Sequence, residues 1–364
     1  MKIETDKHYY WLDAIRFIAA FMVLLSHTRN DFFCEYSELP VEQHNLASFI
    51  FYLFGRLGHE AVIVFFVLSG FLVGGRTLER IKDGGFDVRL YAINRFSRIY
   101  PPLIISILFY YFTCIFVSTE TWDWGVAIGN FLNLQGILCN SLVNPFWSLS
   151  YEWWFYIVLA SIGVSITANK RWIKLLGFLS ACISISVFLV GEMTIFYLAI
   201  WLLGALAYLI KPSNYNKGLF VISLLGMVTG IALYQLSTDT HAFSFPIRIS
   251  NSQIIELYMS FMTCLFIQQV ILIKPSSKLT NYFERVLGYM GNFSYTLYLS
   301  HRIICMWIFC FVFEKHGGNF TTVNIFLYFG VVLICLFGCW LLYLVSEKHT
   351  AKIKKKIASL LITR

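Results

Sequence analysis

Long apolar runs, each bounded by short polar stretches, recur along the whole chain. A helix of about 20 predominantly apolar residues crosses the hydrocarbon core of a bilayer. Ten segments meet this requirement, at about 10–33, 57–75, 100–118, 147–166, 173–190, 193–210, 218–235, 253–273, 293–313 and 322–346. The pattern predicts an all-α fold, namely a polytopic membrane helix bundle of about ten transmembrane helices.

The stretch 122–138 is apolar but is broken by glycine and asparagine residues. We interpret it as a re-entrant or interfacial element, because such residues weaken a spanning helix. The alternative is an eleventh span, which would place Lys170, Arg171 and Lys174 outside the cell.

Composition and charge support a membrane protein with a defined orientation. Charged residues make up 13% of the chain, against about 25% in soluble domains. Of the 28 Lys and Arg residues, 22 fall on the side of the bundle that holds both termini. Positive loops face the cytoplasm, so we expect both termini to be cytoplasmic. The start of the chain lacks a small-residue cleavage site, and we expect the first helix to be retained.

The spans end near residue 346, and the segment after them is basic with an apolar stripe. We therefore predict one membrane-embedded domain, 1–346, and a basic cytoplasmic tail, 347–364. The simplest interpretation of the tail is an interfacial helix on anionic lipid. No basic patch interleaved with aromatic residues lies outside the spans, so we expect no nucleic-acid partner. No His or Cys cluster has metal-ligand spacing, so we expect no metal site.

The first span carries two ionisable side chains, Arg16 and His27, which are costly in a bilayer. Eleven residues separate them, so they project from nearly the same helix face, with an axial gap of about 16 Å. We expect both to face one enclosed passage that opens to the cell interior. Arg16 would hold an anionic group, and His27 would act as a base. The alternatives are a local ion pair of Arg16 with Asp13 and a packing hydrogen bond for His27.

The loop after the second span places Arg95 and Arg98 on one face of a short helix, with Pro101 and Pro102 favouring a helix start at the third span. These arginines are candidates for a phosphate clamp or for ordinary positive-inside anchoring. In the second span, Ser69 and Gly70 indicate either close helix packing or a helix break that admits a ligand.

Two later spans carry further candidates. Glu152 is an intramembrane carboxylate that could orient His27 or an acceptor, and Trp147 could stack on a sugar ring or belong to an aromatic belt. In the ninth span, Tyr298 and His301 lie on one polar stripe with Ser294. Whether this stripe is catalytic or supports other residues is left open.

Five motifs in this order resemble the acyltransferase family 3 integral membrane proteins. They are Arg16 with His27, FFVLSGF at 65–71, RFSRIYP at 95–101, WSLSYE at 147–152 and SYTLYLSH at 294–301. The resemblance implies a ten-helix bundle in a bacterial inner membrane and an acyl-coenzyme A donor used from the cytoplasm. It implies catalytic roles for Arg16 and His27 and donor binding by Arg95 and Arg98. Many members carry an acidic residue where this chain has Ile63, which weakens inferences about the acceptor.

The hypothesis is therefore O-acylation, with acetyl as the expected group, of a hydroxyl on a cell-surface polysaccharide or lipid-linked glycan. His27, Arg16 and Glu152 are the candidate catalytic residues. Arg95, Arg98, Arg16, Ser69 and Gly70 are candidates for binding acyl-coenzyme A, and Trp147, Tyr298 and His301 for substrate binding or support. The alternative is a transporter or flippase of a glycan or its lipid carrier, which would also carry intramembrane ionisable residues.

Overall fold

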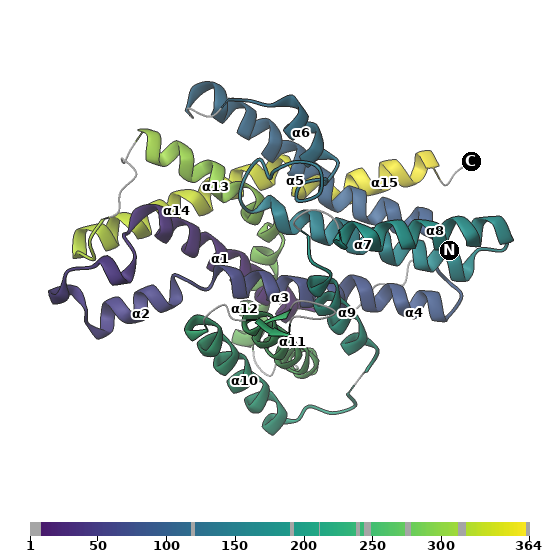
Figure 1. The fold of residues 1–364 in the computed structure, drawn as a ribbon, viewed down its shortest axis with the longest axis horizontal. Coiled ribbons are helices and arrows are strands. Elements are labelled where there is room, and N and C mark those ends of the chain that lie inside the picture. The colour runs from purple at the N-terminus through teal and green to yellow at the C-terminus, as the bar shows by residue number, and fades with distance from the viewer. Residues whose placement is uncertain are drawn as a thin grey trace.

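The computed structural model describes residues 9–117, 121–189, 193–210, 212–237, 241–243, 249–273, 278–311 and 318–361. Its main helices and two short strands are α1 (Tyr10–Phe32), α2 (Leu46–Phe54), α3 (Gly58–Ser69), a π-helix (Gly70–Gly75), α4 (Arg76–Lys82), α5 (Val88–Phe116), α6 (Trp124–Phe131), α7 (Phe146–Thr167), α8 (Arg171–Ser186), α9 (Ile195–Leu209), α10 (Lys217–Leu236), β1 (His241–Phe243), β2 (Ile249–Ser250), α11 (Asn251–Val270), α12 (Lys278–Gly291), α13 (Ser294–Phe311), α14 (Thr322–Val345) and α15 (Thr350–Leu361). Figure 1 shows them packed as a helical bundle.

The all-α membrane fold predicted from the hydropathy pattern is confirmed. A helix occupies each of the ten predicted spans. By length and composition, seven helical stretches in the described part of the chain are suited to cross a membrane, and α9 is an apolar helix of shorter length. The helices α11 and α13 are less hydrophobic than these seven stretches and are not among them. Both bury polar side chains inside the bundle, such as Glu256 and His301, where protein rather than lipid surrounds them.

Polar residues set the points at which the apolar helices begin. Asp87 caps α5 by accepting hydrogen bonds from the backbone of Arg89 at 2.8 Å and of Leu90 at 3.2 Å. Asn216 caps α10 in the same way, and Thr321 caps α14. These side chains satisfy backbone N–H groups that the first helical turn leaves unpaired. The polar interruptions of the hydropathy pattern therefore coincide with helix starts.

The third spanning helix begins earlier than the sequence indicated. We expected a short helix with Arg95 and Arg98, followed by a new start at the prolines. The structure instead has one 29-residue helix that runs through Pro101 and Pro102. The Asp87 cap supplies the start, and the two prolines remove the N–H groups that would bond to the carbonyls of Ser97 and Arg98. The expected break is therefore only a local loss of hydrogen bonds.

The segment 122–138 does not span a membrane. Its helix α6 has eight residues, which corresponds to about 12 Å of rise, well short of the roughly 30 Å of hydrocarbon. The remainder of the segment forms turns and an isolated bridge between Gln135 and Cys139. The alternative of an eleventh span therefore does not fit this segment, and its interfacial or re-entrant position stays a prediction.

The starts of α1, α5 and α13 and the end of α14 meet at one end of the bundle. Residues from all four regions line a shared cavity there, including Arg16, Arg95, Asn292 and Tyr343. At the opposite end, Phe33 after α1 forms a bridge with Gly318 before α14. This arrangement fits helices that alternate in direction, with the beginning of α1 and the end of α14 on the same side. That side carries the excess of positive residues, so it is the side that we predict to face the cytoplasm.

Close packing, rather than a ligand, accounts for the glycines after Ser69. The chain from Gly70 to Gly75 is a π-helix, and it contacts α9. A Cβ atom at Gly70 would overlap the carbonyl oxygen of Trp201, and one at Gly74 would lie 2.7 Å from the Cβ of Ala205. Small residues at these positions let the two backbones approach. The structure thus favours the packing interpretation for Gly70.

We expect Gly70→Ala to destabilise the protein by about 1–3 kcal/mol, because the added methyl group has no space against the α9 backbone. Thermal unfolding in detergent micelles measures this change. Gly330→Ala on α14 is the matched control, since a Cβ there meets no atom within 4 Å. Equal melting temperatures for the two variants would contradict the packing role.

Candidate active site

Arg16 and Arg98 stand between two cavities. Both side chains line a cavity of about 100 Å³ inside the bundle, called here the inner cavity. Both also line a wider cavity of about 470 Å³ at the cytoplasmic end, called here the basic cavity. The Nη2 atom of Arg16 donates to Oδ1 of Asp13 at 2.6 Å. Arg16 therefore makes the local ion pair considered as its alternative role and also faces a ligand-sized space.

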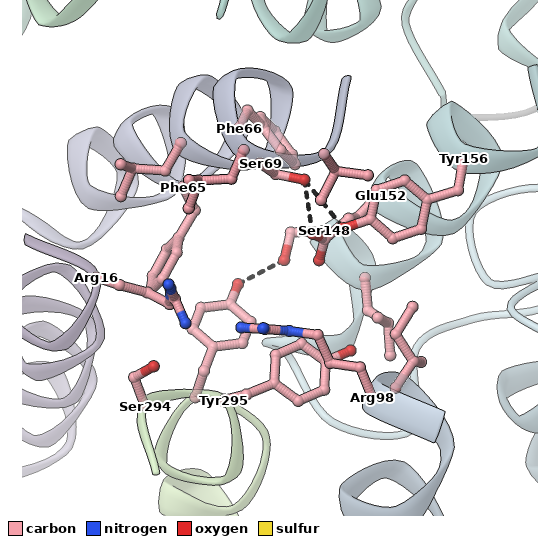
Figure 2. A pocket seen from close by; sticks show the side chains of 16 residues that line it. Arg16, Phe65, Phe66, Ser69, Arg98, Ser148, Glu152, Tyr156, Ser294 and Tyr295 are labelled. Carbon is pink, nitrogen blue, oxygen red and sulfur yellow. Dashed lines mark hydrogen bonds between the residues drawn. The ribbon is translucent and has the colours of Figure 1, made fainter. Parts of the chain in front are cut away.

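The inner cavity is mainly apolar, with polar groups at its two ends. Figure 2 shows the guanidinium groups of Arg16 and Arg98 reaching in from opposite sides, with Ser69 and Glu152 on the wall away from them. The lining residues are Arg16, Phe65, Phe66, Leu68, Ser69, Leu72, Val73, Arg98, Ile99, Ser148, Leu149, Glu152, Tyr156, Ser294, Tyr295 and Tyr298. The hydroxyl of Tyr295 is buried and has no hydrogen-bond partner, so a ligand in the cavity would satisfy it.

The carboxylate of Glu152 organises one wall of the inner cavity. Its Oε1 accepts a hydrogen bond from Ser69 Oγ at 2.7 Å and another from the hydroxyl of Tyr156. The indole Nε1 of Trp201 donates to Ser69 Oγ at 3.1 Å. Four side chains from α3, α7 and α9 thus hold one another in place (Figure 2 shows three of them). These bonds tie Glu152 to Ser69 and Tyr156 rather than to His27, whose orientation was one of the roles considered for it.

The basic cavity collects cations from distant parts of the chain. It is lined by Arg16, Asn94, Arg95, Ser97, Arg98, Asn292, Tyr343, Glu347, Lys348, Thr350, Ala351 and Lys354. The guanidinium of Arg95 lies 5.4 Å from the ring centre of Tyr156, a cation–π distance. Its Nε and the Oδ1 of Asn94 are buried without hydrogen-bond partners. Cations gathered around unsatisfied polar atoms are suited to a phosphate ligand.

His27 and His301 form a pair deeper in the membrane. The Nδ1 of His27 lies 3.2 Å from the Nε2 of His301, and the Nδ1 of His301 lies 2.9 Å from the carbonyl oxygen of Leu297. Since a carbonyl only accepts, His301 donates through Nδ1, and its neutral ring must then accept through Nε2. His27 therefore donates through Nδ1. Its Nε2 is left with a free lone pair, as a general base requires.

Tyr298 connects the histidine pair to the inner cavity. Its ring centre is 6.4 Å from that of His301, and its hydroxyl lies 2.6 Å from Ser148 Oγ, another lining group. The histidines themselves do not line either cavity. The expectation that Arg16 and His27 face one open passage is thus met only at Arg16, whereas the histidine pair lies beside Tyr298, outside the cavity lining.

Two other candidates lie away from the cavities. Trp147 packs against Phe66, Tyr151 and Tyr197 in an aromatic cluster, and Gly70 packs against α9. The structure brings together Arg16, Arg98, Ser69, Glu152 and Tyr298 around the inner cavity, with Arg95 in the basic cavity. His301, whose role was left open, is the partner of His27.

The sequence reasoning missed several lining residues. Tyr156 follows Glu152 by four residues on the same helix, and this spacing could have identified it. Tyr295 sits within the SYTLYLSH motif but was not singled out. The contributions of Asn94, Lys348 and Lys354 depend on how α5 and the C-terminal segment pack, which no local pattern shows. In the part of the chain that the structure describes, no three His, Cys, Asp or Glu side chains are grouped as metal ligands.

Comparison with known proteins shows the family to which the chain belongs. A family model described as "Acyltransferase domain" matches residues 9–344. A protein of Haemophilus influenzae, described as uncharacterized, is 29% identical over 128 residues, which is 31% of this chain and 52% of that protein. The chain thus aligns with about half the length of this relative. No solved structure matches the chain. Because this match covers nearly the whole chain, the protein belongs to the family that the model describes, and its apolar helices indicate a multi-pass membrane protein.

Proposed function

We propose that the protein is an O-acyltransferase of a bacterial inner membrane. It moves an acyl group, most simply acetyl, from cytoplasmic acyl-coenzyme A to a hydroxyl of a cell-surface polysaccharide or lipid-linked glycan. The observation that carries this proposal is the placement of Arg16 and Arg98 on the border of both cavities. A donor with an anionic head and a long thin arm fits such a pair of spaces. Family membership favours this function over the transporter alternative.

The basic cavity would hold the phosphates of the donor. Arg95 and Arg98 present guanidinium groups, which match phosphate oxygens in geometry and charge. The unpartnered N–H at Nε of Arg95 would donate to a phosphate oxygen, and the unpartnered Oδ1 of Asn94 could accept from an N–H or O–H group of the nucleotide. The prolines also free the carbonyls of Ser97 and Arg98, which could accept from N–H groups of the nucleotide base but not from phosphate. These features support phosphate and nucleotide binding at the cytoplasmic end.

The inner cavity would take the end of the pantetheine arm with its thioester. Phe65, Leu72 and Ile99 provide an apolar surface, and Ser69 with Tyr295 provides hydroxyls. The inner cavity is small, about 100 Å³. It admits a short acyl group but not a long chain, which supports acetyl as the transferred group.

His27 would supply the proton transfers. Its free Nε2 takes the proton from the acceptor hydroxyl as the oxygen attacks the thioester carbon. The new C–O bond forms, the C–S bond breaks, and the leaving sulfur receives the proton from His27. His301 holds the imidazole in the required tautomer. Glu152 keeps Ser69 and Tyr156 in place on the cavity wall. The acyl group must pass Tyr298 to reach the histidine pair.

The test follows an acyl label from donor to glycan. We expect the purified protein in lipid nanodiscs to bind coenzyme A, and cells that express it to carry acetyl groups on a surface glycan. Mass spectrometry of surface glycans with and without the protein identifies the acceptor and the acyl group together. Glycans of identical mass in the two strains, together with no coenzyme A binding by calorimetry, would contradict the proposal.

A further inference from the structure

The C-terminal segment forms part of the basic cavity. Glu347 anchors it, since Oε2 of Glu347 accepts hydrogen bonds from the backbone N of Thr296 at 3.0 Å and from its Oγ1 at 2.9 Å. From there α15 contacts α5, and Figure 1 shows the two helices running together. Ile353 and Ile357 share an apolar groove with residues of α5. The apolar stripe that suggested an interfacial helix therefore faces protein along part of its length.

This packing divides the lysines of the segment into two sets. Lys348 and Lys354 line the basic cavity together with Arg16, Arg95 and Arg98. Lys352, Lys355 and Lys356 do not line it, although all five lysines are exposed. Binding to anionic lipid alone does not require lysines that line a cavity. Binding of an anionic ligand in that cavity does.

Thr350 adds a hydrogen-bonding group to the same wall. Its Oγ1 is buried and has no partner, and the residue lines the basic cavity. Lys354 follows it by four residues, so the two side chains lie on one face of α15. A hydroxyl and an ammonium presented together are suited to phosphate oxygens.

The cations of the basic cavity outnumber its acidic groups. Five Lys and Arg side chains line it against one carboxylate, that of Glu347. Like charges brought close together repel, and a polyanionic ligand relieves that repulsion. The excess of cations therefore indicates more than one phosphate position.

The order of the groups along coenzyme A indicates which residues would meet which phosphate. The diphosphate joins directly to the pantetheine arm, and the ribose phosphate lies farther from it. Arg16 and Arg98 stand where the arm would enter the inner cavity, so they are placed to meet the diphosphate. Lys348, Thr350 and Lys354 line only the basic cavity.

We propose that these three residues bind the 3′-phosphate of the donor nucleotide, so that the C-terminal segment determines specificity for coenzyme A. This inference rests on the proposed function.

The test compares two donors and two double variants. Acetyl-coenzyme A carries the 3′-phosphate, and acetyl-3′-dephospho-coenzyme A lacks it. We expect the wild type to have a lower KM for the first donor. K348A/K354A should raise KM for acetyl-coenzyme A by roughly tenfold or more and leave KM for the dephospho donor within about twofold, since only the first donor offers the lost contact. K348R/K354R should recover most of the difference.

K352A/K356A is the matched control, because it removes the same charge from exposed positions of the same helix. We expect it to behave as the wild type with both donors. The inference is overturned if the two double variants are equivalent, or if the wild type does not distinguish the donors. In either case the wild type still uses acetyl-coenzyme A, whereas failure of the proposed function would abolish transfer from both donors. Melting temperatures of all variants exclude a general loss of folding.

Discussion

Replacing His27 by alanine should lower acyl transfer by about 10²–10⁴-fold, the usual contribution of a positioned general base. The hydrogen-bond chain from the Leu297 carbonyl through His301 leaves the Nε2 of His27 with a free lone pair. Alanine removes that atom but leaves Arg16 and Arg98 in place, so coenzyme A binding should stay nearly unchanged. Initial rates of label transfer and calorimetric binding measure the two quantities separately.

His301 provides a matched comparison for this experiment. His301→Ala removes the acceptor for His27 Nδ1 and should give a smaller loss, because His27 keeps its imidazole but not its fixed tautomer. His301→Gln offers an amide that both donates and accepts, and should recover part of the rate. Full transfer by His27→Ala at normal protein levels would remove the general-base role. Equal losses in His301→Ala and His301→Gln would remove the tautomer argument.

Replacing Arg98 by alanine should lower kcat/KM for the acyl donor by roughly 100-fold, since the loss of a charged partner in a partly buried site costs about 2–5 kcal/mol. Arg98 lines both cavities, so its guanidinium meets the donor where the head and the arm join. Steady-state kinetics over a range of donor concentrations show the effect as a higher KM.

Two substitutions sharpen the interpretation of this result. Arg89→Ala removes an exposed arginine from the same helix, outside both cavities, and should leave the kinetics unchanged. Arg98→Lys keeps the charge but loses the planar fork, so it should recover only part of the affinity. If Arg98→Ala and Arg89→Ala had the same KM, the arginine would be a topological anchor rather than a donor contact.

Hydropathy was sufficient to locate the helices, because the bilayer imposes both length and apolarity on every span. It was less informative about where a helix begins. The cap at Asp87 starts α5 well before the prolines, and a polar stretch before a span does not show whether it is loop or helix. Hydropathy also could not show that the polar side chains of α11 and α13 are buried against protein.

The site was predictable as a set of residues but not as an arrangement. Arg16 and Arg98 are conspicuous because charge is costly near a membrane. The bond between His27 and His301 joins residues 274 apart in sequence, and only tertiary packing fixes it. The same holds for Trp201, whose indole reaches Ser69 from α9. The C-terminal segment was predicted to lie on lipid, because its amphipathic pattern does not identify the surface that it covers.

The position of Tyr298 at the inner cavity limits hydrolysis of the acyl donor. In the proposed reaction the thioester lies in the inner cavity, which Tyr298 lines and the histidine pair does not. Before an acceptor binds, the thioester is therefore apart from His27. Water that enters the inner cavity then meets an acyl group away from the imidazole base, and the Glu152 carboxylate there already accepts hydrogen bonds from Ser69 and Tyr156. An idle protein would hydrolyse little of its donor, and a membrane could hold many copies without draining the metabolic supply of activated acyl groups.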